Sequence, residues 1–287
     1  MTVHLEPSFD ELKRNLHRLK KEEILYFDEK KDREAVSKYY RKISIRKAKF
    51  QQLHSLVERT HANRLPYFLS KDQYLYTWVD LQPDYTIKSI YSGKQDDPAD
   101  LIRRDFEVSR RYEDFQMLLD QKGESVIHHH VPEELKFNAE HIVPQSWFIG
   151  REPMKGDLHH LFACEPSCNA VRSNFPYYDF PDYNPESPTE TIKNHCGVAA
   201  ADLFEPEFGK GTAARAMLYF LLRYPKGIKK RFRSKINFNL LRSWNQQFPP
   251  DLYEKHRNQA IYQIQGNRNP FIDFPELADV IYIPLRW

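Results

Sequence analysis

Two regularly spaced apolar patterns near the N-terminus predict helices. Ser8 with Glu11 three positions later is a capping-box signature, and it opens an amphipathic stretch from residue 9 to about residue 26. A second stretch, from about residue 32 to residue 60, is rich in Lys, Arg and Gln and carries apolar residues at helical spacing. We expect these two stretches to form a helical hairpin or an arm.

The chain thereby divides into an N-terminal helical extension, residues 1–65, and a main domain, residues 66–287. In the main domain the composition shifts toward aromatic and β-branched residues. Residues 74–81 and 86–91, separated by turn-forming residues, predict a β-hairpin. A charged segment follows, and then a helix over about 105–121.

Residues 137–174 combine three kinds of pattern. Short apolar stretches at 137–143 and 157–163 predict strands. Pro166 suits the first turn of a helix that would continue to about Asn174. The order strand, loop, strand, helix therefore predicts a mixed α+β fold.

Two strong helical patterns complete the chain, at 212–223 and 252–265. The longest apolar run is Ala216–Leu222, which suits a buried helix and is far shorter than a membrane span requires. We therefore expect no membrane partner.

Candidate chemistry is concentrated in two segments. Residues 137–147 read FNAEHIVPQSW, and residues 157–174 read DLHHLFACEPSCNAVRSN. In this order and at this spacing they resemble the active-site motifs of the endonuclease I family, within the His-Me finger (ββα-metal) superfamily. Blocks at 204–219 and 265–273 are similar to later parts of that family. The resemblance runs from about Tyr74 to Asp273.

The resemblance implies a fold, an activity and roles for individual residues. The fold would be a ββα-metal core wrapped by helices. His141 would be the general base that activates water, and Glu140 and Asn169 would be the protein ligands of one Mg²⁺. The activity would be a largely sequence-nonspecific endonuclease that acts on DNA, with RNA as a second candidate substrate and 5′-phosphates on the products.

This chemistry also follows from the residue types. A neutral imidazole is a suitable base near pH 7, because its ordinary pKa is about 6.5. Magnesium prefers oxygen ligands and is often held by only one or two carboxylates. Because neighbours in a strand point to opposite faces, Glu140 and His141 reach one site only from a strand end or a distortion.

Arg172 is a further candidate catalytic residue. Asn169, Arg172 and Ser173 share one face of the predicted helix, so Arg172 is placed to contact phosphate or transition-state charge. A structural ion pair is an equally good interpretation of Arg172. Arg215 and Arg268 are weaker candidates for the same role.

Each of the other residues has a structural alternative. Without the surrounding motifs, Glu140 and His141 would be interpreted as exposed surface residues without a function. Asn169 would be interpreted as the cap of a helix. His159 and His160 are expected to orient the site by hydrogen bonds.

The cysteines and a histidine triplet raise the question of a second metal. Cys164, Cys168 and Cys196, with His195, could hold a structural Zn²⁺, and buried thiols are the alternative. The triplet at 128–130 favours a loop, because three consecutive side chains rarely converge on one ion.

Charge and cysteine usage bear on partners and compartment. The net charge is only +3, but residues 226–235 form a basic run that could follow nucleic-acid phosphates or simply be a solvated loop. An odd number of cysteines, 3, argues against a disulfide framework and fits a reducing compartment. The N-terminal residues show no secretory pattern, so we expect a cytoplasmic protein unless it leaves by another route.

Two other functions remain open at this point. One is a non-catalytic nucleic-acid-binding protein on the same fold, and cleavage of a plasmid with Mg²⁺ but not with EDTA separates it from a nuclease. The other is a zinc hydrolase, which the absence of a His-Glu-x-x-His motif weakens.

Overall fold

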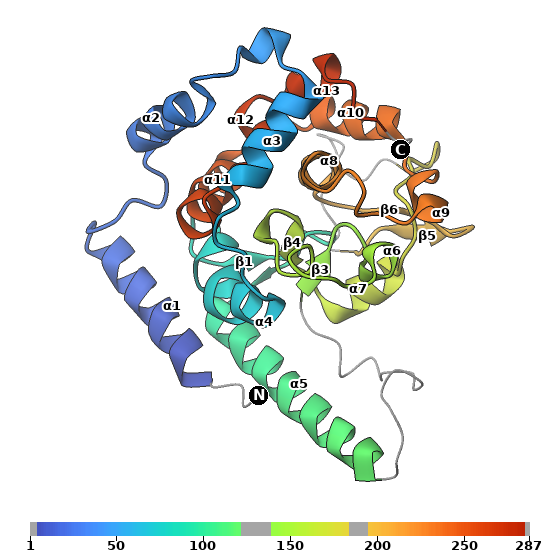
Figure 1. Ribbon diagram of the computed structural model, residues 1–287. Helices are drawn as coiled ribbons and strands as arrows, with labels where there is room; N and C mark the ends of the chain where they lie inside the picture. Colours follow the sequence, from blue (N-terminus) through green and yellow to red (C-terminus); the bar gives the residue numbers. More distant parts are fainter. Residues whose placement is uncertain (1–4, 122–138, 184–194, 285–287) are drawn as a thin grey trace.

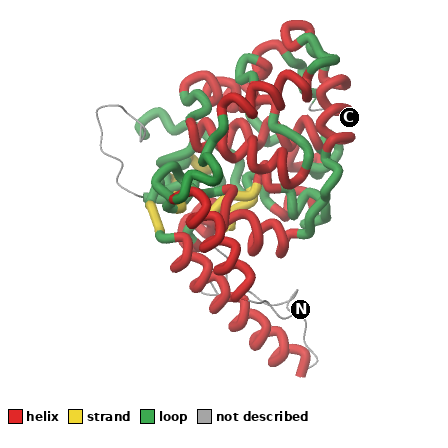
Figure 2. The backbone as a smooth tube through the Cα atoms, turned by 90° about the vertical axis from the view of Figure 1, so that its left-hand side faces the viewer, coloured by secondary structure: helices red, strands yellow, loops and turns green. Residues whose placement is uncertain are grey.

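The computed structural model describes residues 5–121, 139–183 and 195–284. The fold is mixed α/β and mostly helical, with few short strands (Figures 1 and 2). Within the described ranges, no helix combines the length and the apolar character that crossing a bilayer demands. The histidine triplet at 128–130 lies outside the described residues.

The helices differ widely in length. The longer ones are α1 (Leu5–Lys20), α2 (Glu29–Tyr40), α3 (Phe50–Thr60), α5 (Pro98–Gln121), α8 (Lys210–Arg223), α10 (Phe238–Gln247) and α11 (Leu252–Gln265). The short ones are α4 (Tyr67–Leu69), α6 (Gln145–Phe148), α7 (Pro166–Arg172), α9 (Lys230–Arg233), α12 (Pro270–Asp273) and α13 (Leu277–Val280). Two 3-10 turns, η1 (Ile45–Lys47) and η5 (Leu158–His160), and one π-helix, η2 (Ser70–Val79), lie between them.

Each strand of the described residues pairs with its neighbour in sequence. The three antiparallel pairs are β1 (Ile87–Lys88) with β2 (Gln95–Asp96), β3 (Ala139–His141) with β4 (Leu161–Ala163), and β5 (Val198–Ala200) with β6 (Leu203–Glu205).

Helix α8 forms the centre of the larger hydrophobic core. Every residue of α8 except Thr212 is buried, which confirms the buried helix predicted from Ala216–Leu222. A helix that is apolar on all sides needs neighbours on all sides. These neighbours are α3, α10, α12 and η5 (Figure 1). α8 therefore connects segments from both halves of the chain.

A second core cluster lies under the N-terminal helices. Helix α1 buries Leu12 and packs on η2 and α5. Helix α3 instead contributes Leu53 and Val57 to the larger core around α8. Both N-terminal helices thus share cores with the rest of the chain, and a domain boundary at residue 65 stays a prediction.

The hairpin predicted over residues 74–91 is wrong in its first half. Residues 70–79 form the π-helix η2, with Leu75, Tyr76 and Val79 buried. The spacing of these three residues fits one helical face, and burial of that face decides against the strand that their aromatic and β-branched character favours. Only the second half holds a strand, β1, and its partner is β2.

Most other predicted elements have counterparts. The helix expected at 105–121 lies within α5, and the two C-terminal helical patterns correspond to α8 and α11. The second N-terminal stretch is divided, since η1 separates α2 from α3. Residues 139–172 contain strand, strand and helix in the predicted order, as β3, β4 and α7.

Candidate active site

The candidate site is built on β3, β4 and α7. His141 pairs with Leu161 and Glu140 pairs with Phe162 across the two strands. Helix α7 follows β4 directly and starts with Pro166, whose missing N–H costs nothing in a first turn. The Asn169 side-chain Nδ2 donates to the Ala139 carbonyl at 3.0 Å. This bond ties the helix to the first strand, so the predicted site residues come together on one small unit.

Glu140 is a buried carboxylate with two polar partners. The Tyr91 hydroxyl donates to its Oε1 at 2.8 Å, and the Arg172 Nε lies 3.0 Å from the same oxygen. Burial raises the pKa of Glu140 to about 7, although Arg172 and Tyr91 act in the opposite direction. A buried negative charge is tolerated here because a cation and a hydroxyl compensate it.

His141 is held in one tautomer. Its Nε2 lies 2.8 Å from the Lys155 carbonyl oxygen. A carbonyl can only accept, so Nε2 carries the proton and Nδ1 keeps its lone pair. The Gln145 side-chain amide lies 3.3 Å from Nδ1, on the acceptor side of the ring. Burial, with a smaller contribution from His160, lowers the pKa of His141 to about 3, so the ring is neutral.

The two adjacent side chains have different surroundings. His141 is the last residue of β3, where the chain leaves the strand, and its ring centroid lies 5.3 Å from that of Tyr67 and 5.4 Å from that of His160. Glu140 instead contacts Tyr91 and Arg172. A strand end was one of the two positions that the alternation of side chains allowed for this pair.

Arg172 is buried and bonded inside the protein. Besides Glu140, its guanidinium donates to the carbonyl oxygens of Phe175 at 2.6 Å and Ile142 at 3.0 Å. Helix α7 ends at Arg172, so Ser173 lies beyond the helix rather than on its face. The geometry matches the ion-pair interpretation of Arg172.

Arg215 and Arg268 are also buried in ion pairs. Arg215 pairs with Glu254, and Arg268 pairs with Asp32 and Asp273. Neither guanidinium contacts any of the residues that bond Glu140 or His141 in the described part of the chain.

Asp157 organises the loop that returns to β4. Its side chain caps η5 by accepting from the His159 N–H at 3.1 Å, and it accepts from the hydroxyls of Tyr219 and Tyr224 at 2.7 and 2.9 Å. Burial opposes ionisation, but His61 and the other nearby histidines lower the pKa of Asp157 below its usual range. α8 and the segment after it thus hold the start of β4 through one carboxylate.

His159 and His160 are buried rather than exposed to a cleft. The Nε2 of His159 lies 3.2 Å from the Asn267 carbonyl, and that of His160 lies 2.5 Å from the Met154 carbonyl. Burial lowers the pKa of both, to about 4 for His159. These ring nitrogens bond backbone carbonyls rather than Glu140, His141 or Asn169, so the orienting role stays a prediction.

Sequence analysis missed three contacts of the site. Tyr91 lies 49 positions before Glu140, and Gln145 and Lys155 touch His141 from the loop between the strands. The Lys155 contact is made by a backbone carbonyl, which any residue provides, so no residue type could have indicated it.

Comparison with known proteins decides the family. The family description "Endonuclease I" matches residues 47–276. The chain belongs to the endonuclease I family.

Several proteins similar to this chain are named as nucleases. The chain is 34% identical to an "Extracellular ribonuclease" of Bacillus amyloliquefaciens, over 44% of this chain and 46% of that protein. It is also 34% identical to an "Extracellular deoxyribonuclease" of Aeromonas hydrophila, over 42% of this chain and 50% of that protein. A "Periplasmic deoxyribonuclease" of the same organism is 34% identical, over 42% and 48%. The match spans about half the length of these relatives.

These names contradict the expected compartment. The relatives are extracellular or periplasmic proteins, whereas sequence analysis placed the chain in the cytoplasm. The cytoplasmic expectation rested on the N-terminal residues alone and is wrong.

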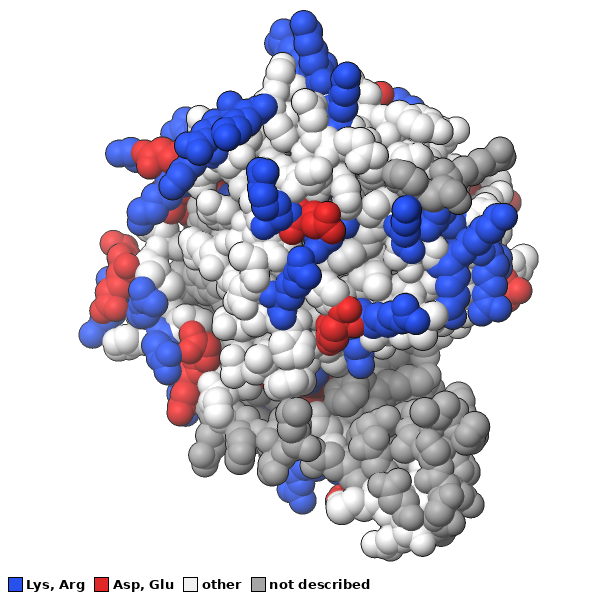
Figure 3. All heavy atoms as spheres, in the orientation of Figure 1, with Lys and Arg blue, Asp and Glu red and all other residues white. Residues whose placement is uncertain are grey.

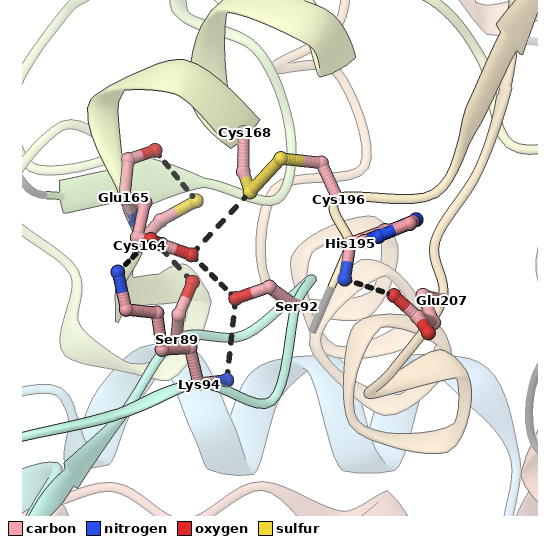
Figure 4. The surroundings of a disulfide bond; sticks show 9 residues. All are labelled: Ser89, Ser92, Lys94, Cys164, Glu165, Cys168, His195, Cys196 and Glu207. Atoms are coloured by element: carbon pink, nitrogen blue, oxygen red, sulfur yellow. Dashed lines mark hydrogen bonds and ion pairs between the residues drawn. A yellow bond between two sulfur atoms is a disulfide. The ribbon is translucent and has the colours of Figure 1, made fainter. Parts of the chain in front are cut away.

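The cysteines differ from the zinc site and from the reducing compartment that the sequence suggested, and only Cys164 is the buried thiol of the alternative interpretation. Cys168 and Cys196 are joined by a disulfide across 28 positions, and Cys164 is a buried thiol (Figure 4). Disulfides persist in oxidising compartments, so the reducing compartment is not supported. Sulfur atoms bonded to each other are not thiolate ligands, so the Zn²⁺ at Cys164, Cys168 and Cys196 is not supported either. Nowhere in the described ranges do His, Cys, Asp and Glu side chains form a metal-binding group of 3 or more.

The disulfide fixes the helix that carries Asn169. Cys168 is the residue before Asn169 on α7, and Cys196 leads into β5 (Figure 4). At Cys196, the preceding residue His195 donates its backbone N–H to the Glu207 carboxylate. The cross-link therefore ties α7 to the segment before β5, in addition to its contact with β3.

A basic segment adjoins the site. Helix α9 lies in the predicted basic run, and Figure 3 shows Lys and Arg side chains gathered at the edge where Figure 1 places α9. The Lys229 N–H donates to the Trp147 carbonyl at 2.8 Å, and the Phe232 ring stacks on the Trp147 ring. Trp147 belongs to α6, which also carries Gln145. Helix α6 therefore contacts the basic segment through Trp147 and His141 through Gln145.

Removing the disulfide is expected to destabilise the fold without unfolding it. The double variant Cys168→Ser with Cys196→Ser should lose about 2–4 kcal/mol of unfolding free energy, because the cross-link restricts a loop of 28 residues in the unfolded chain. Urea unfolding of wild type and variant measures the loss. A reducing agent should destabilise the wild type and leave the double variant unchanged; equal stability of both proteins under oxidising conditions would contradict the prediction.

Acid is expected to destabilise the protein through its buried histidines. The pKa values of His141 and His159 in the folded protein are about 3 and about 4, whereas the unfolded value is about 6.5. As the pH falls below about 6.5, these histidines bind protons in the unfolded chain but stay neutral in the folded protein, so the unfolded state is favoured. These two histidines contribute a loss of about 2–4 kcal/mol between pH 7 and pH 5. Glu140 offsets part of this loss, because its raised pKa of about 7 lets the folded protein bind a proton in the same range. Urea unfolding at both pH values measures the net change.

Two single variants test the origin of this loss. His141→Gln should lose less stability in acid than the wild type, because one of the buried histidines with a lowered pKa is gone. His17→Ala removes an exposed histidine and should keep the full dependence. An unchanged dependence in His141→Gln would assign the effect to other groups.

Proposed function

We propose that the chain is a Mg²⁺-dependent, largely sequence-nonspecific endonuclease that hydrolyses phosphodiester bonds of DNA and of RNA. The observation that carries this proposal is the tautomer of His141, whose Nε2–H is held by the Lys155 carbonyl while Nδ1 keeps its lone pair. A neutral ring with a directed lone pair is what a general base requires. Family membership and the nuclease names of the relatives support the same activity.

The residues present fit one magnesium ion. The Asn169 Nδ2 is held by the Ala139 carbonyl, so the amide oxygen is the atom left for a ligand. Glu140 supplies a carboxylate whose Oε1 is bonded to Tyr91 and Arg172, which leaves Oε2 for the same purpose. One carboxylate and one amide oxygen match the ligand preference of magnesium. When bound, the ion would stabilise charge on the phosphate and the leaving oxygen.

His141 would accept the proton of the attacking water at Nδ1. The Lys155 carbonyl then stabilises the ring while it is protonated, because its bond to Nε2–H becomes charge-assisted. Burial among apolar and neutral groups disfavours the protonated ring, so the proton is released readily after each cleavage. General-base help of this kind is worth about 10²–10⁴-fold in rate.

We assign Arg172 a positioning role rather than a contact with phosphate. Its guanidinium is buried and donates to Glu140 and to the carbonyls of Ile142 and Phe175. These bonds fix the direction of the Glu140 carboxylate and compensate its charge. Rotating Arg172 toward a substrate would leave those groups unpaired in the interior, which is costly.

The basic segment at residues 226–235 would bind the phosphate backbone. Its position behind α6 puts positive charge beside the hairpin that carries His141. Phosphate contacts carry no sequence information, and they suit both DNA and RNA. The relatives named as deoxyribonucleases and ribonucleases fit a substrate range of this kind.

We also propose that the protein acts outside the cytoplasm. The relatives named extracellular and periplasmic support this location, and so does the Cys168–Cys196 disulfide. An oxidising compartment would keep α7 cross-linked while the enzyme works.

Loss of the base is expected to remove most of the activity. His141→Ala should lower the cleavage rate of supercoiled plasmid and of RNA by about 10²–10⁴-fold with Mg²⁺ present, because no other group in this geometry takes the water proton. The measurement is initial rates by gel electrophoresis, and EDTA should abolish cleavage by the wild type.

The exposed His17 provides the matched control. His17→Ala should cleave at the wild-type rate. Full activity in His141→Ala would remove His141 from the mechanism, and binding of nucleic acid without any Mg²⁺-dependent cleavage by the wild type would favour a non-catalytic binding protein.

Neutralising the basic segment is expected to weaken binding in a salt-dependent way. The double variant Lys230→Ala with Arg231→Ala should flatten the dependence of log affinity on log salt by about 1–2, since each lost phosphate contact removes about 0.9 from the slope on duplex DNA. Fluorescence anisotropy with His141→Ala as the background avoids cleavage during the titration.

A second pair of exposed basic residues serves as the control. Arg46 and Lys47 lie on η1, in a different part of the fold, and replacing both with Ala removes the same charge. The two double variants should differ in slope. Equal slopes would show that net charge alone, rather than the segment beside α6, determines binding.

A further inference from the structure

A cavity of about 300 Å³ lies outside the candidate active site and is lined by neither Glu140, His141 nor Asn169. It is enclosed by three parts of the chain: residues 82–90, the start of α8, and the segment that joins α10 to α11. Its volume is at the lower end of those that hold small ligands. The lining residues used below are Gln82, Lys88, Phe208, Thr212, Phe248 and Tyr253.

Gln82 is a buried polar side chain that lines this cavity. Its exposed fraction is 6%. Its backbone bonds to the turn that follows, but its side-chain amide has no hydrogen-bond partner among the residues that the structure describes. An amide both donates and accepts, so this side chain can bond a ligand group that offers both an acceptor and a donor.

Positive charge also lines the cavity. The Lys88 Nζ lies 5.0 Å from the centroid of the Phe208 ring, and within the described chain it has no acidic partner. Phe208 directly precedes Gly209, the N-cap of α8, which provides no side-chain cap for the first turn. The uncapped N–H groups of a helix start attract anions. The Thr212 hydroxyl lines the cavity beside them.

The acidic groups of the cavity already have partners. Glu254 is ion-paired with Arg215, and the Asp251 side chain caps α11 by accepting from the Glu254 N–H at 2.9 Å. A Cβ at Gly211 would lie 2.3 Å from the Phe248 carbonyl oxygen, so this glycine permits the close approach that brings Phe248 to the start of α8. The rings of Phe208, Phe248 and Tyr253 supply the apolar part of the lining.

We propose that this cavity binds a nucleotide, with the base among the aromatic rings and Gln82, and the phosphate at Lys88 and the first turn of α8. Glutamine pairs well with the donor and acceptor edge of adenine, and aromatic rings accept any base. The nucleotide is either a free 5′-mononucleotide or the terminal nucleotide of a strand. Its identification as a nucleotide, rather than another aromatic anion, rests on the proposed nuclease function.

The cavity is joined to the candidate active site by a short segment. The Ile90 N–H donates to the Ala163 carbonyl of β4 at 3.0 Å, and the next residue, Tyr91, bonds Glu140. Lys88 and Ile90 line the cavity. A nucleotide bound there would therefore lie beside the site without occupying it.

Calorimetric titration of the full chain in EDTA tests this proposal. 5′-AMP should bind, and adenosine and inorganic phosphate should each bind about tenfold more weakly or worse, because each lacks one half of the ligand. Lys88→Ala should weaken 5′-AMP about tenfold, and the nearly isosteric Gln82→Met should also weaken it. Thr212→Phe, at a partly exposed position, should fill the cavity and abolish binding.

A control variant separates the cavity from other binding. Lys94→Ala removes an equal charge from the same hairpin, outside the cavity, and should bind 5′-AMP like the wild type. Absence of binding at millimolar concentration, or wild-type affinity in both Lys88→Ala and Thr212→Phe, would overturn the proposal.

Further titrations distinguish the two nucleotide sources and the two proposals. A 5′-phosphorylated tetranucleotide that binds more tightly than 5′-AMP would identify a strand end, and the reverse order would identify a free mononucleotide. Plasmid cleavage with Mg²⁺ is measured separately. Binding of 5′-AMP without plasmid cleavage would support the cavity proposal and contradict the nuclease proposal. Cleavage without binding would support the nuclease proposal and contradict the cavity proposal.

Discussion

The structure depends on one buried carboxylate. Glu140 lies in a short strand with almost no exposure, and its charge is compensated by Arg172 from α7 and by Tyr91 from a distant segment. Removing one partner of such a pair costs several kcal/mol. Helix α7 therefore packs beside β3 so that Arg172 meets Glu140, and the segment before α5 brings Tyr91 to the same carboxylate. The unit that carries His141 and Asn169 gains its rigidity from this requirement.

Local patterns predicted the parts of the fold that local geometry decides. The order of strands and helix from β3 to α7 was predictable because strand residues, Pro166 and the two motifs follow one another within 40 residues. η2 was misread because aromatic and β-branched residues suit a strand, and only burial of the Leu75 and Tyr76 face by α1 and α5 selects a helix. A single sequence does not contain that packing.

The candidate site shows the same division. His141, Glu140 and Asn169 were found from motif spacing, but Tyr91, Gln145 and the Lys155 carbonyl were not, because their contacts arise only when the chain folds. The cysteines failed differently. A zinc site and a disulfide use the same thiols, and the choice depends on the compartment, which the first residues of this sequence did not indicate.

Helix α8 has a consequence for how the molecule comes apart. Because α3, α10, α12 and η5 all pack on it, each of them loses a shared partner once α8 is displaced. Asp157 adds a polar anchor to the same helix through the Tyr219 hydroxyl. Fragments that end before α8 lack the surface on which α3 packs. We therefore expect such truncated proteins not to form the larger hydrophobic core.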